Sequence, residues 1–403
     1  MLRNILRIFK ILSIVVTKRI TLSYPKKKKI IVFDNVSNFH ILNNFFDKSI
    51  TYVMPIRVSE IKKIYVNIFI INFLAKNFLK SSLKINYLKA LIKLIEPKVI
   101  ITAVDNSVEF QKIAKELHKS IKFIAVQQAF REYSYFPKSW VKDVFIPEYY
   151  CWGNYDVNMF KSKRLKVKEY KIFGSLKICK FLKKKERNTK EIYDICLPSH
   201  GLPHPNYYRN TKKYNKGNFA KWARSEFVEG VYLPNVYPSL DKTAIMIFNL
   251  SKKYDFKFVI ASRYEKKNKN FSLEKKYYEK LFQSKKFKII PNDIKNFSSY
   301  KTISRSKLII GLNSSILRET LELKKKILVC NFTGVNNIYF PINKKFIVKE
   351  DSISQFEKKF FSISNMSTKK YYEILGKTKN NLIHDSKNCD IILKNRVNEL
   401  LQN

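Results

Sequence analysis

The stretch Leu308–Leu328, LIIGLNSSILRETLELKKKIL, decides the fold of this chain. An apolar run ends at Gly311, an Asn and two hydroxyl residues follow, and an apolar-periodic segment then carries Glu319. A second apolar run, from Ile327 to Phe332, comes directly afterwards. Continuous apolar runs are typical of strands buried in a parallel sheet, and small polar residues before a periodic run mark a helix start. The stretch therefore predicts a strand, a tight turn, a helix and a second strand.

The turn and the helix start also predict a ligand site. Backbone amides at a helix N-terminus attract phosphate, and the residues placed to hold it are Gly311, Asn313, Ser314 and Ser315. The Glu319 carboxylate, in the second turn, could accept hydrogen bonds from a ribose or sugar hydroxyl. Together these features indicate a nucleotide-sugar site. The alternative is an ordinary βαβ unit in which Ser314 caps the helix and Glu319 is a surface carboxylate favoured by the helix dipole.

The same alternation of apolar runs and helical patterns extends through most of the chain. It predicts strands at 30–34, 50–54, 99–104, 123–126, 144–152, 170–173, 193–197, 256–261 and 287–290. The segment 64–74 is long and apolar, which fits a core helix as well as a strand. Such alternation is typical of a parallel sheet with helices on both faces. We therefore expect an α/β chain of two tandem Rossmann-like, doubly wound domains that face each other across a cleft.

Composition sets the boundaries between these parts. Residues 177–190 are dominated by Lys, Arg, Glu and Asn, which favours a linker. The expected organisation is an amphipathic N-terminal segment (1–24), an N-terminal domain (25–176), the linker (177–190), a C-terminal domain (191–350) and a helical C-terminal tail (351–403).

The net charge is extreme, because 79 Lys and Arg face 32 Asp and Glu for a formal charge of +47. The basic residues are mostly Lys, spread from end to end among many Asn, Ile, Tyr and Phe, as expected of a genome rich in A and T codons. The sequence contains no zinc-finger spacing, RNP-type motif or Arg-rich tract. Nucleic acid is therefore not the favoured partner. Attraction to an anionic membrane or to a phosphorylated substrate is favoured instead.

The N-terminal segment carries Arg3, Arg7 and Lys10 on one helical stripe and apolar residues largely on the other side. Its longest uncharged run, 11–17, is too short to span a bilayer. A basic amphipathic helix of this kind either lies on the cytoplasmic face of a membrane or packs on the body of the protein.

The cysteines and histidines indicate in which cellular compartment the protein works and whether it binds a metal. The five Cys contain no CxxC pair, so a disulfide framework or a structural zinc site is not predicted. The only close His pair is His200 and His204, and Gly201-Leu202-Pro203 between them indicates a loop and not a helix face, so no metal site is predicted there either. We expect a cytoplasmic protein, with peripheral attachment to the inner face of the cytoplasmic membrane as an option.

Three stretches carry a resemblance to a known family. The segment that begins at Ser306, SKLIIGLNSSILRETLELKKKIL, resembles the donor-site segment of GT-B glycosyltransferases. Thr102–Glu132 and Tyr149–Lys177 resemble bacterial surface-carbohydrate biosynthesis proteins, transferases that build capsule or lipopolysaccharide. The similarity touches most of the chain, without a motif as specific as a Walker signature.

The chain departs from the family pattern in two places. Lys324 and Lys326 stand where relatives have Gly and Pro, and Gln127-Gln128-Ala129 replaces an expected Gln-Asn-Gly turn. A left-handed turn without Gly costs about 1 kcal/mol. These departures bear on catalytic competence more than on fold.

The resemblance implies transfer of a sugar from a nucleotide-sugar, as co-substrate, to a surface-polysaccharide or lipid-linked acceptor, without a metal or a tightly bound cofactor. The N-terminal domain would hold the acceptor and the C-terminal domain the donor. Ser314 and Ser315 would hold the phosphates, and Arg263, at a strand end, would add charge by bidentate contact. Arg263 could equally flank a loop. His200 and His204 lie in the first loop of the second domain and either touch the donor phosphate or are satisfied within the loop.

The catalytic base is expected in the first domain. Asp105 follows a buried strand at the cleft end, where a carboxylate can take a proton from the acceptor, although a turn or helix N-cap Asp fits as well. Asp34 occupies the equivalent place after the first strand and is the reserve candidate. Gln127 and Asn106 would line the acceptor side. Two other functions remain open, namely a nucleotide-sugar epimerase of the same fold and a non-catalytic basic protein that binds membrane or RNA.

Overall fold

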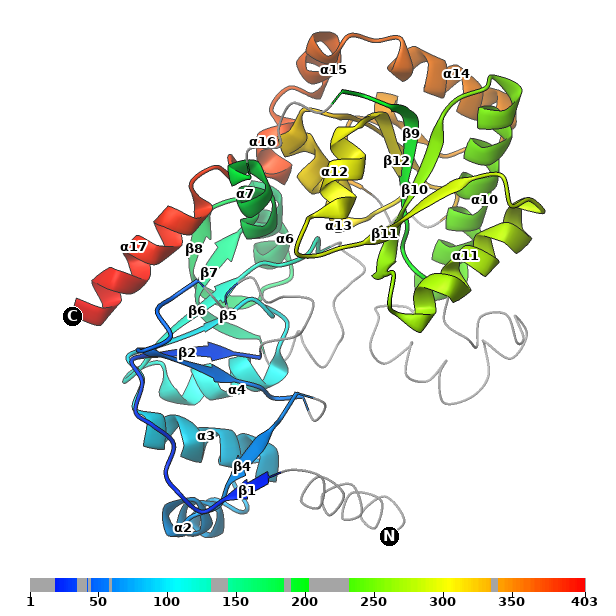
Figure 1. Ribbon diagram of the computed structural model, residues 1–403. Coiled ribbons are helices and arrows are strands. Elements are labelled where there is room, and N and C mark those ends of the chain that lie inside the picture. The colour runs from blue at the N-terminus through cyan, green and yellow to red at the C-terminus, as the bar shows by residue number, and fades with distance from the viewer. Residues whose placement is uncertain are drawn as a thin grey trace.

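The computed structural model describes residues 19–34, 42, 45–57, 60–131, 144–184, 190–202, 232–334 and 340–402. It shows two α/β domains, each built on a six-stranded parallel sheet, joined by a short helix and a returning C-terminal tail (Figure 1). The expected fold class is confirmed. Residues 1–18 of the expected amphipathic N-terminal segment (1–24), and His204, lie outside the described residues, while the end of that segment contains a short strand (Arg19–Thr21).

The sheet of the first domain has the strand order β3-β2-β5-β6-β7-β8. Its strands are β2 (Ile30–Phe33), β3 (Thr51–Met54), β5 (Val99–Thr102), β6 (Lys122–Val126), β7 (Phe145–Cys151) and β8 (Lys166–Ile172). Its helices include α3 (Leu83–Ile95), α4 (Val108–Leu117) and α6 (Asn154–Ser162). Every residue of β2 and β5 is buried, which explains their unbroken apolar sequence. The strand order reverses beside β2, so a topological switch point lies at the carboxyl ends of β2 and β5.

The apolar segment 64–74 is neither a single core helix nor a single strand. It divides at Asn67 into β4 (Lys63–Tyr65) and α2 (Ile68–Lys76), because the Asn67 side chain accepts a hydrogen bond from the Ile70 amide and starts the helix. β4 pairs in parallel with β1 (Arg19–Thr21) in a separate two-stranded sheet.

The sheet of the second domain has the strand order β11-β10-β9-β12-β13-β14. Its strands are β9 (Tyr193–Pro198), β10 (Phe258–Glu265), β11 (Lys288–Asn292), β12 (Ser306–Gly311), β13 (Lys326–Cys330) and β14 (Ile347–Val348). Its helices include α10 (Tyr232–Lys253), α11 (Lys269–Phe282), α12 (Ser298–Ser304) and α13 (Ser315–Thr320). Here the switch point lies between β9 and β12.

The stretch that decides the fold forms β12, α13 and β13, as predicted. A Cβ at Gly311 would lie 3.0 Å from Leu317 Cδ1, so the glycine lets α13 pack closely over the end of β12. The helix passes into a 3₁₀ turn (Leu321–Leu323) and ends at Lys324, whose φ is +54°. The left-handed turn without Gly that the sequence implied is therefore present.

The expected linker begins as a helix. α7 (Leu176–Lys183) has buried Ile178 and Phe181 in the core of the second domain and buried Leu176 and Cys179 in a core of the first domain. The Lys-rich composition of the segment hid this pattern, because Lys177, Lys180 and Lys183 alternate with the buried apolar residues.

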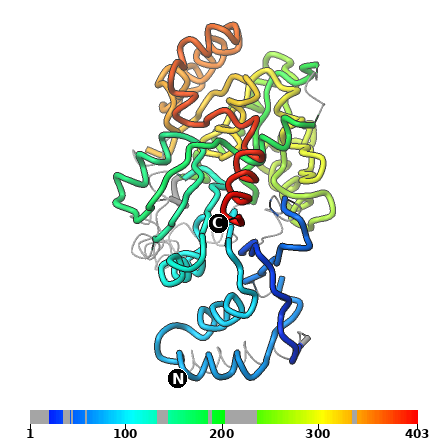
Figure 2. Tube along the Cα trace, turned by 90° about the vertical axis from the view of Figure 1, so that its left-hand side faces the viewer, coloured from blue at the N-terminus to red at the C-terminus, as the bar shows by residue number. Residues whose placement is uncertain are grey.

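The C-terminal tail is helical, as predicted, and comprises α14 (Ile353–Ser364), α15 (Thr368–Leu375), α16 (Thr378–Leu382) and α17 (Cys389–Gln402). α17 runs back along the first domain (Figures 1 and 2), where Leu393, Val397 and Leu400 share a core with strands β2 and β5. No helix among the described ranges combines the length and apolarity needed to cross a bilayer.

Candidate active site at the domain junction

Helix α13, at the carboxyl end of β12, lies directly against the first domain. The Phe130 amide donates a hydrogen bond of 2.8 Å to Ser315 Oγ, and Ser175 Oγ donates to Glu319 Oε1. Arg318 reaches across to Asp156 of α6 with two hydrogen bonds of 2.9 and 2.7 Å. The helix predicted to bind a donor is thus also part of the contact between the domains.

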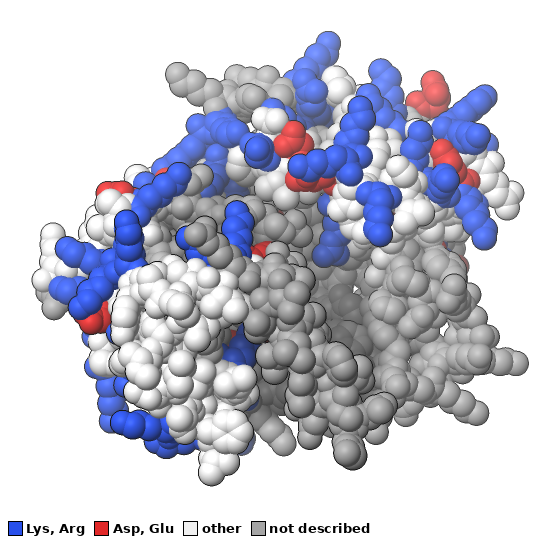
Figure 3. Space-filling model, turned by 60° about the horizontal axis from the view of Figure 1, so that its bottom comes forward, with Lys and Arg blue, Asp and Glu red and all other residues white. Residues whose placement is uncertain are grey.

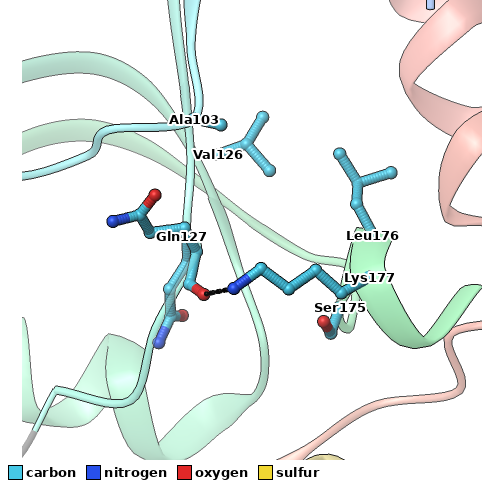
Figure 4. A pocket seen from close by; sticks show the side chains of 7 residues that line it. Ala103, Val126, Gln127, Ser175, Leu176 and Lys177 are labelled. Carbon is cyan, nitrogen blue, oxygen red and sulfur yellow. Dashed lines mark hydrogen bonds between the residues drawn. The ribbon is translucent and has the colours of Figure 1, made fainter. Parts of the chain in front are cut away.

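A small pocket of about 10 Å³, room for about one water molecule, opens beside this contact (Figure 4). It is lined by the ends of β5 and β6 and by the start of α7, through Ala103, Val126, Gln127, Gln128, Ser175, Leu176 and Lys177. The Lys177 side chain extends across it and donates a hydrogen bond of 3.4 Å to the Gln128 carbonyl. The pocket lies at the carboxyl edge of a parallel sheet, which is where open α/β sheets bind ligands.

Lys177 is the centre of a charged cluster drawn from both domains. Burial lowers the pKa of its ammonium, and the nearby Glu319 carboxylate opposes that shift; Arg263, Arg131 and Asp105 also act on it electrostatically. The structure therefore brings together Asp105, Glu319 and Arg263, three residues that the sequence predicted for one site. Lys177 itself was missed, because its basic surroundings favoured a linker. The position of Lys177 just after Gly174-Ser175, near the end of a strand, is the sequence feature that could have indicated its role.

Asp105 is fully buried and its carboxylate is already occupied. Arg131 donates to both oxygens, at 2.6 Å to Oδ1 and 3.3 Å to Oδ2, and the Tyr149 hydroxyl donates to Oδ2 at 2.8 Å. Both carboxylate oxygens are therefore already engaged by neighbouring side chains. The geometry argues against the expected role as catalytic base. The alternative is confirmed in part: Asp105 lies in the turn between β5 and α4, but the N-cap residue of α4 is Ser107.

Asp34, the reserve candidate, has the properties expected of a base. It lies at the carboxyl end of β2, next to the β5 edge that carries Asp105 and the half-buried Asn106. Burial raises the pKa of its carboxyl, and Arg57, whose Nε lies 3.3 Å from Oδ1, partly offsets that shift. Its φ of +54° marks a strained backbone at this edge, a feature that clusters at functional sites.

Glu319 does not stand ready for a sugar hydroxyl, nor is it a surface carboxylate. It is 2% exposed and accepts hydrogen bonds from Ser175 Oγ and from the Tyr300 hydroxyl, the latter at 2.8 Å. Burial raises the pKa of its carboxyl, while Lys177 lowers it. This correction follows from the contact between the domains, which the sequence of α13 does not reveal.

The other residues predicted to bind phosphate, in the turn after β12, differ in their surroundings. Ser315 Oγ is engaged by the first domain through Phe130. Ser314 is the N-cap residue of α13, is half-buried, and makes no side-chain cap hydrogen bond, contrary to the capping alternative. Asn313 is buried at the end of β12, beside Gly311.

Arg263 and His200 lie together at the carboxyl ends of β10 and β9. Arg263 is exposed, and its Nη1 donates to the His200 carbonyl at 3.0 Å. Burial lowers the pKa of His200 to about 4, and the charge of Arg263 adds to this shift. Within the described residues, His200 Nε2 has no hydrogen-bond partner. The imidazole is therefore neutral at physiological pH. Of the two residues, Arg263 carries the positive charge at the carboxyl ends of β9 and β10.

Gln127 contributes to the pocket wall, but its amide serves the protein itself. Its Nε2 donates to Asp156 Oδ1 at 2.9 Å and to the Ala129 carbonyl, and its Oε1 accepts from the Trp152 amide at 2.8 Å. Gln127 thus holds the turn after β6 against α6, and the acceptor-binding role predicted for its side chain is not supported by this geometry.

The arrangement of the whole chain is similar to that of three enzymes of known structure. The putative UDP-N-acetylglucosamine 2-epimerase of Listeria monocytogenes matches with a TM-score of 0.53 at 8% identity, over 94% of this chain and 98% of that one. The UDP-GlcNAc 2-epimerase of Neisseria meningitidis, bound to UDP-GlcNAc, matches with a TM-score of 0.50 at 15% identity, over 93% and 100%. The wall teichoic acid polymerase TagF matches with a TM-score of 0.51 at 10% identity, over 94% and 90%.

These similarities show the fold, and the expected GT-B arrangement is confirmed. No protein-family model matches the chain, and no curated protein matches it in sequence.

Proposed function

We propose that the protein is a nucleotide-sugar-dependent enzyme, and in the first place a glycosyltransferase that moves a sugar to a surface-polysaccharide or lipid-linked acceptor. The observation that carries this proposal is the cluster around Lys177, where charged residues of both domains gather beside a pocket at a sheet's carboxyl edge. Solved structures of the same fold include an epimerase with UDP-GlcNAc bound and a teichoic acid polymerase, which supports a substrate of this class.

On the donor side, Arg263 and Lys177 hold the diphosphate. The Asp105–Arg131 and Glu319–Lys177 pairs each balance one positive charge with one negative charge, so Arg263 is the cation in excess. Its guanidinium is exposed and can form bidentate contacts with phosphate oxygens. Ser314, whose hydroxyl does not cap α13, adds a donor from the turn after β12.

On the acceptor side, the proposal assigns the base to Asp34 instead of Asp105. In an inverting transfer, the acceptor oxygen bonds to the anomeric carbon while Asp34 takes its proton and the bond from that carbon to the donor phosphate breaks. Arg263 and Lys177 stabilise the charge that develops on the leaving diphosphate. The buried group of Asp105, Arg131 and Tyr149 holds the β5 edge in place beneath the pocket.

A thermal-shift series with UDP-, GDP-, CMP- and dTDP-sugars tests the donor site. A donor present at about 100 times its Kd should raise the free energy of unfolding by about 2.7 kcal/mol. Arg263→Gln should abolish most of that shift, because it removes the excess cation. Lys267→Gln, which removes an exposed charge close by in sequence, should keep it. Absence of a shift with every donor, or an equal shift in Arg263→Gln, would contradict the assignment.

Turnover with a bound donor tests the base. Asp34→Asn should keep the thermal shift and lose roughly 100-fold or more of the transfer rate, the range typical of a general base. Asp47→Asn, at an exposed carboxylate of the same domain, should leave the rate unchanged. Full activity in Asp34→Asn would exclude it as the base.

Epimerisation of a nucleotide-sugar is the second candidate, because two of the similar structures are UDP-GlcNAc 2-epimerases. Product analysis separates the two reactions: a transferase releases free nucleotide and glycosylates an acceptor, whereas an epimerase returns an isomerised sugar. A third outcome, no donor binding but RNA binding that falls steeply with salt, would instead support the basic binding protein.

A further inference from the structure

The outer face of α2 and the turn that follows it are apolar and exposed. Leu79 is 94% exposed, Phe78 70%, Ile68 64%, Ile71 51% and Leu83, at the start of α3, 49%. We call these five residues the α2 surface. A helix at a protein surface normally turns its apolar residues inward, and here only Ile70 of α2 is fully buried. An exposed apolar face of this kind marks an interaction site.

The neighbouring strand extends the same surface. β1 pairs with β4, which directly precedes α2, and the exposed large hydrophobic side chains at and after β1 are Ile20, Leu22 and Tyr24. Leu22 is 74% exposed. The apolar area therefore spans two segments that are more than 40 residues apart in sequence.

The chain segment that carries the α2 surface is rich in lysine, and two of its lysines, Lys84 and Lys89, pair with Glu109 and Glu116 of α4. Residues 61–95 contain seven Lys and no Asp or Glu. Four of these lysines, Lys62, Lys63, Lys76 and Lys80, are exposed and have no acidic partner within the described residues. In Figure 3, where the end of the molecule that carries α2 comes forward, a broad uncharged area is bordered by Lys and Arg.

We propose that the α2 surface docks on an anionic phospholipid bilayer. Exposed aliphatic and aromatic side chains enter the boundary between headgroups and acyl chains, and the bordering lysines contact the anionic headgroups. α2 has nine residues and is about 14 Å long, so it lies in the plane of the membrane and does not cross it. This docking is independent of the reaction proposed above.

The position of the α2 surface fits this partner. It lies at the end of the first domain that points away from the second domain (Figures 1 and 2). A membrane contact there leaves the domain junction uncovered. An apolar surface with exposed, unpaired lysines beside it matches an anionic bilayer.

Co-sedimentation of the full chain with vesicles tests the apolar part. The protein should bind phosphatidylglycerol/phosphatidylethanolamine vesicles and bind pure phosphatidylcholine vesicles much more weakly. The double variant Phe78→Gln/Leu79→Gln should lose roughly tenfold or more of its affinity, because two exposed apolar anchors are removed. The matched control, Ile391→Gln/Ile392→Gln on α17, changes two exposed apolar residues elsewhere and should bind like the wild type.

A second pair of variants tests the charge. Lys76→Gln/Lys80→Gln should weaken binding by roughly fivefold for each lysine, and added salt should reduce that difference. Lys266→Gln/Lys267→Gln, at two exposed lysines of the second domain, should have little effect. An unchanged melting midpoint shows that each variant is folded.

Three results would overturn the proposal. Equal binding to anionic and neutral vesicles would exclude the role of the lysines. Wild-type binding by both α2 variants would place the membrane contact elsewhere in the chain. Conversion of a dimer to a monomer by Phe78→Gln/Leu79→Gln, with no change in vesicle binding, would make the α2 surface an interface between two copies of the chain.

Discussion

The His200 imidazole makes the free energy of unfolding depend on pH in the acid range. Burial and the Arg263 charge lower its pKa from 6.5 to about 4 in the folded protein. Above pH 6.5 the imidazole is neutral in both the folded and the unfolded chain, so it adds no pH dependence. Between pH 6.5 and 4 only the unfolded chain binds the proton, and the free energy of unfolding falls by about 3 kcal/mol in total.

Urea unfolding between pH 4 and 7 measures this loss. The wild type should lose stability through that window, and His200→Gln should lose about 3 kcal/mol less because it cannot take up the proton. His118→Gln, on α4 of the first domain, is the control and should follow the wild type. Parallel curves for the wild type and His200→Gln would show that the imidazole is as easily protonated in the folded protein as in the unfolded chain.

Single residues also show where sequence reasoning reaches its limit. The strand ends at Asp34, Asp105 and Asn313 could be predicted, because each follows an unbroken apolar run. The state of their side chains could not. The partners of Asp105 are Arg131 and Tyr149, 26 and 44 positions further along the chain, and no local pattern pairs them.

At the scale of elements, Lys326 joins β13 to α14. Its buried Nζ donates to the carbonyls of Ile363, Ser364 and Met366, at 2.9, 2.7 and 2.7 Å. The last carbonyls of a helix lack intrahelical partners, and a cation there also complements the helix dipole. The residue that stands in place of the expected Pro therefore caps the C-terminus of α14.

Two substitutions at this turn should have opposite effects on the urea unfolding midpoint. Lys326→Met keeps the length of the side chain but leaves the carbonyls without their donor, and should cost about 1–3 kcal/mol. Lys324→Gly relieves the left-handed backbone and should gain up to about 1 kcal/mol. An unchanged unfolding midpoint in Lys326→Met would mean that water takes the place of the ammonium as the donor to these carbonyls.

The elements themselves were largely predictable, and the exceptions share a cause. Buried parallel strands appear in the sequence as apolar runs, so the nine strands expected outside the opening stretch all occur close to their predicted bounds. The segments 64–74 and 177–190 were misjudged because their pattern does not follow burial. α2 exposes apolar residues, and α7 buries apolar residues toward both domains although lysines stand between them.

At the scale of the whole molecule, the buried pair of Arg318 and Asp156 connects the two domains. Both side chains are fully buried, and the guanidinium also lies 5.1 Å from the Phe130 ring centre and 5.2 Å from that of Trp152. Gln127 donates to the same Asp156 carboxylate, so the chain of contacts continues to the turn after β6, at the edge of the pocket. Arg318 lies between Ser315 and Glu319 on α13, and the position of that helix therefore depends on the first domain.

A double-mutant cycle measures how much of the junction depends on this pair. Arg318→Met and Asp156→Leu should each destabilise the protein by about 3–5 kcal/mol, because each leaves an unpaired buried charge. The double variant should be more stable than the sum of the two losses predicts, since it buries no charge. Lys307→Met, which breaks the exposed pair with Asp194, should cost less than about 1 kcal/mol. Single variants at Arg318 and Asp156 that cost no more than Lys307→Met would show that packing alone holds the domains together, and α13 would then be free to move with the second domain when a donor binds.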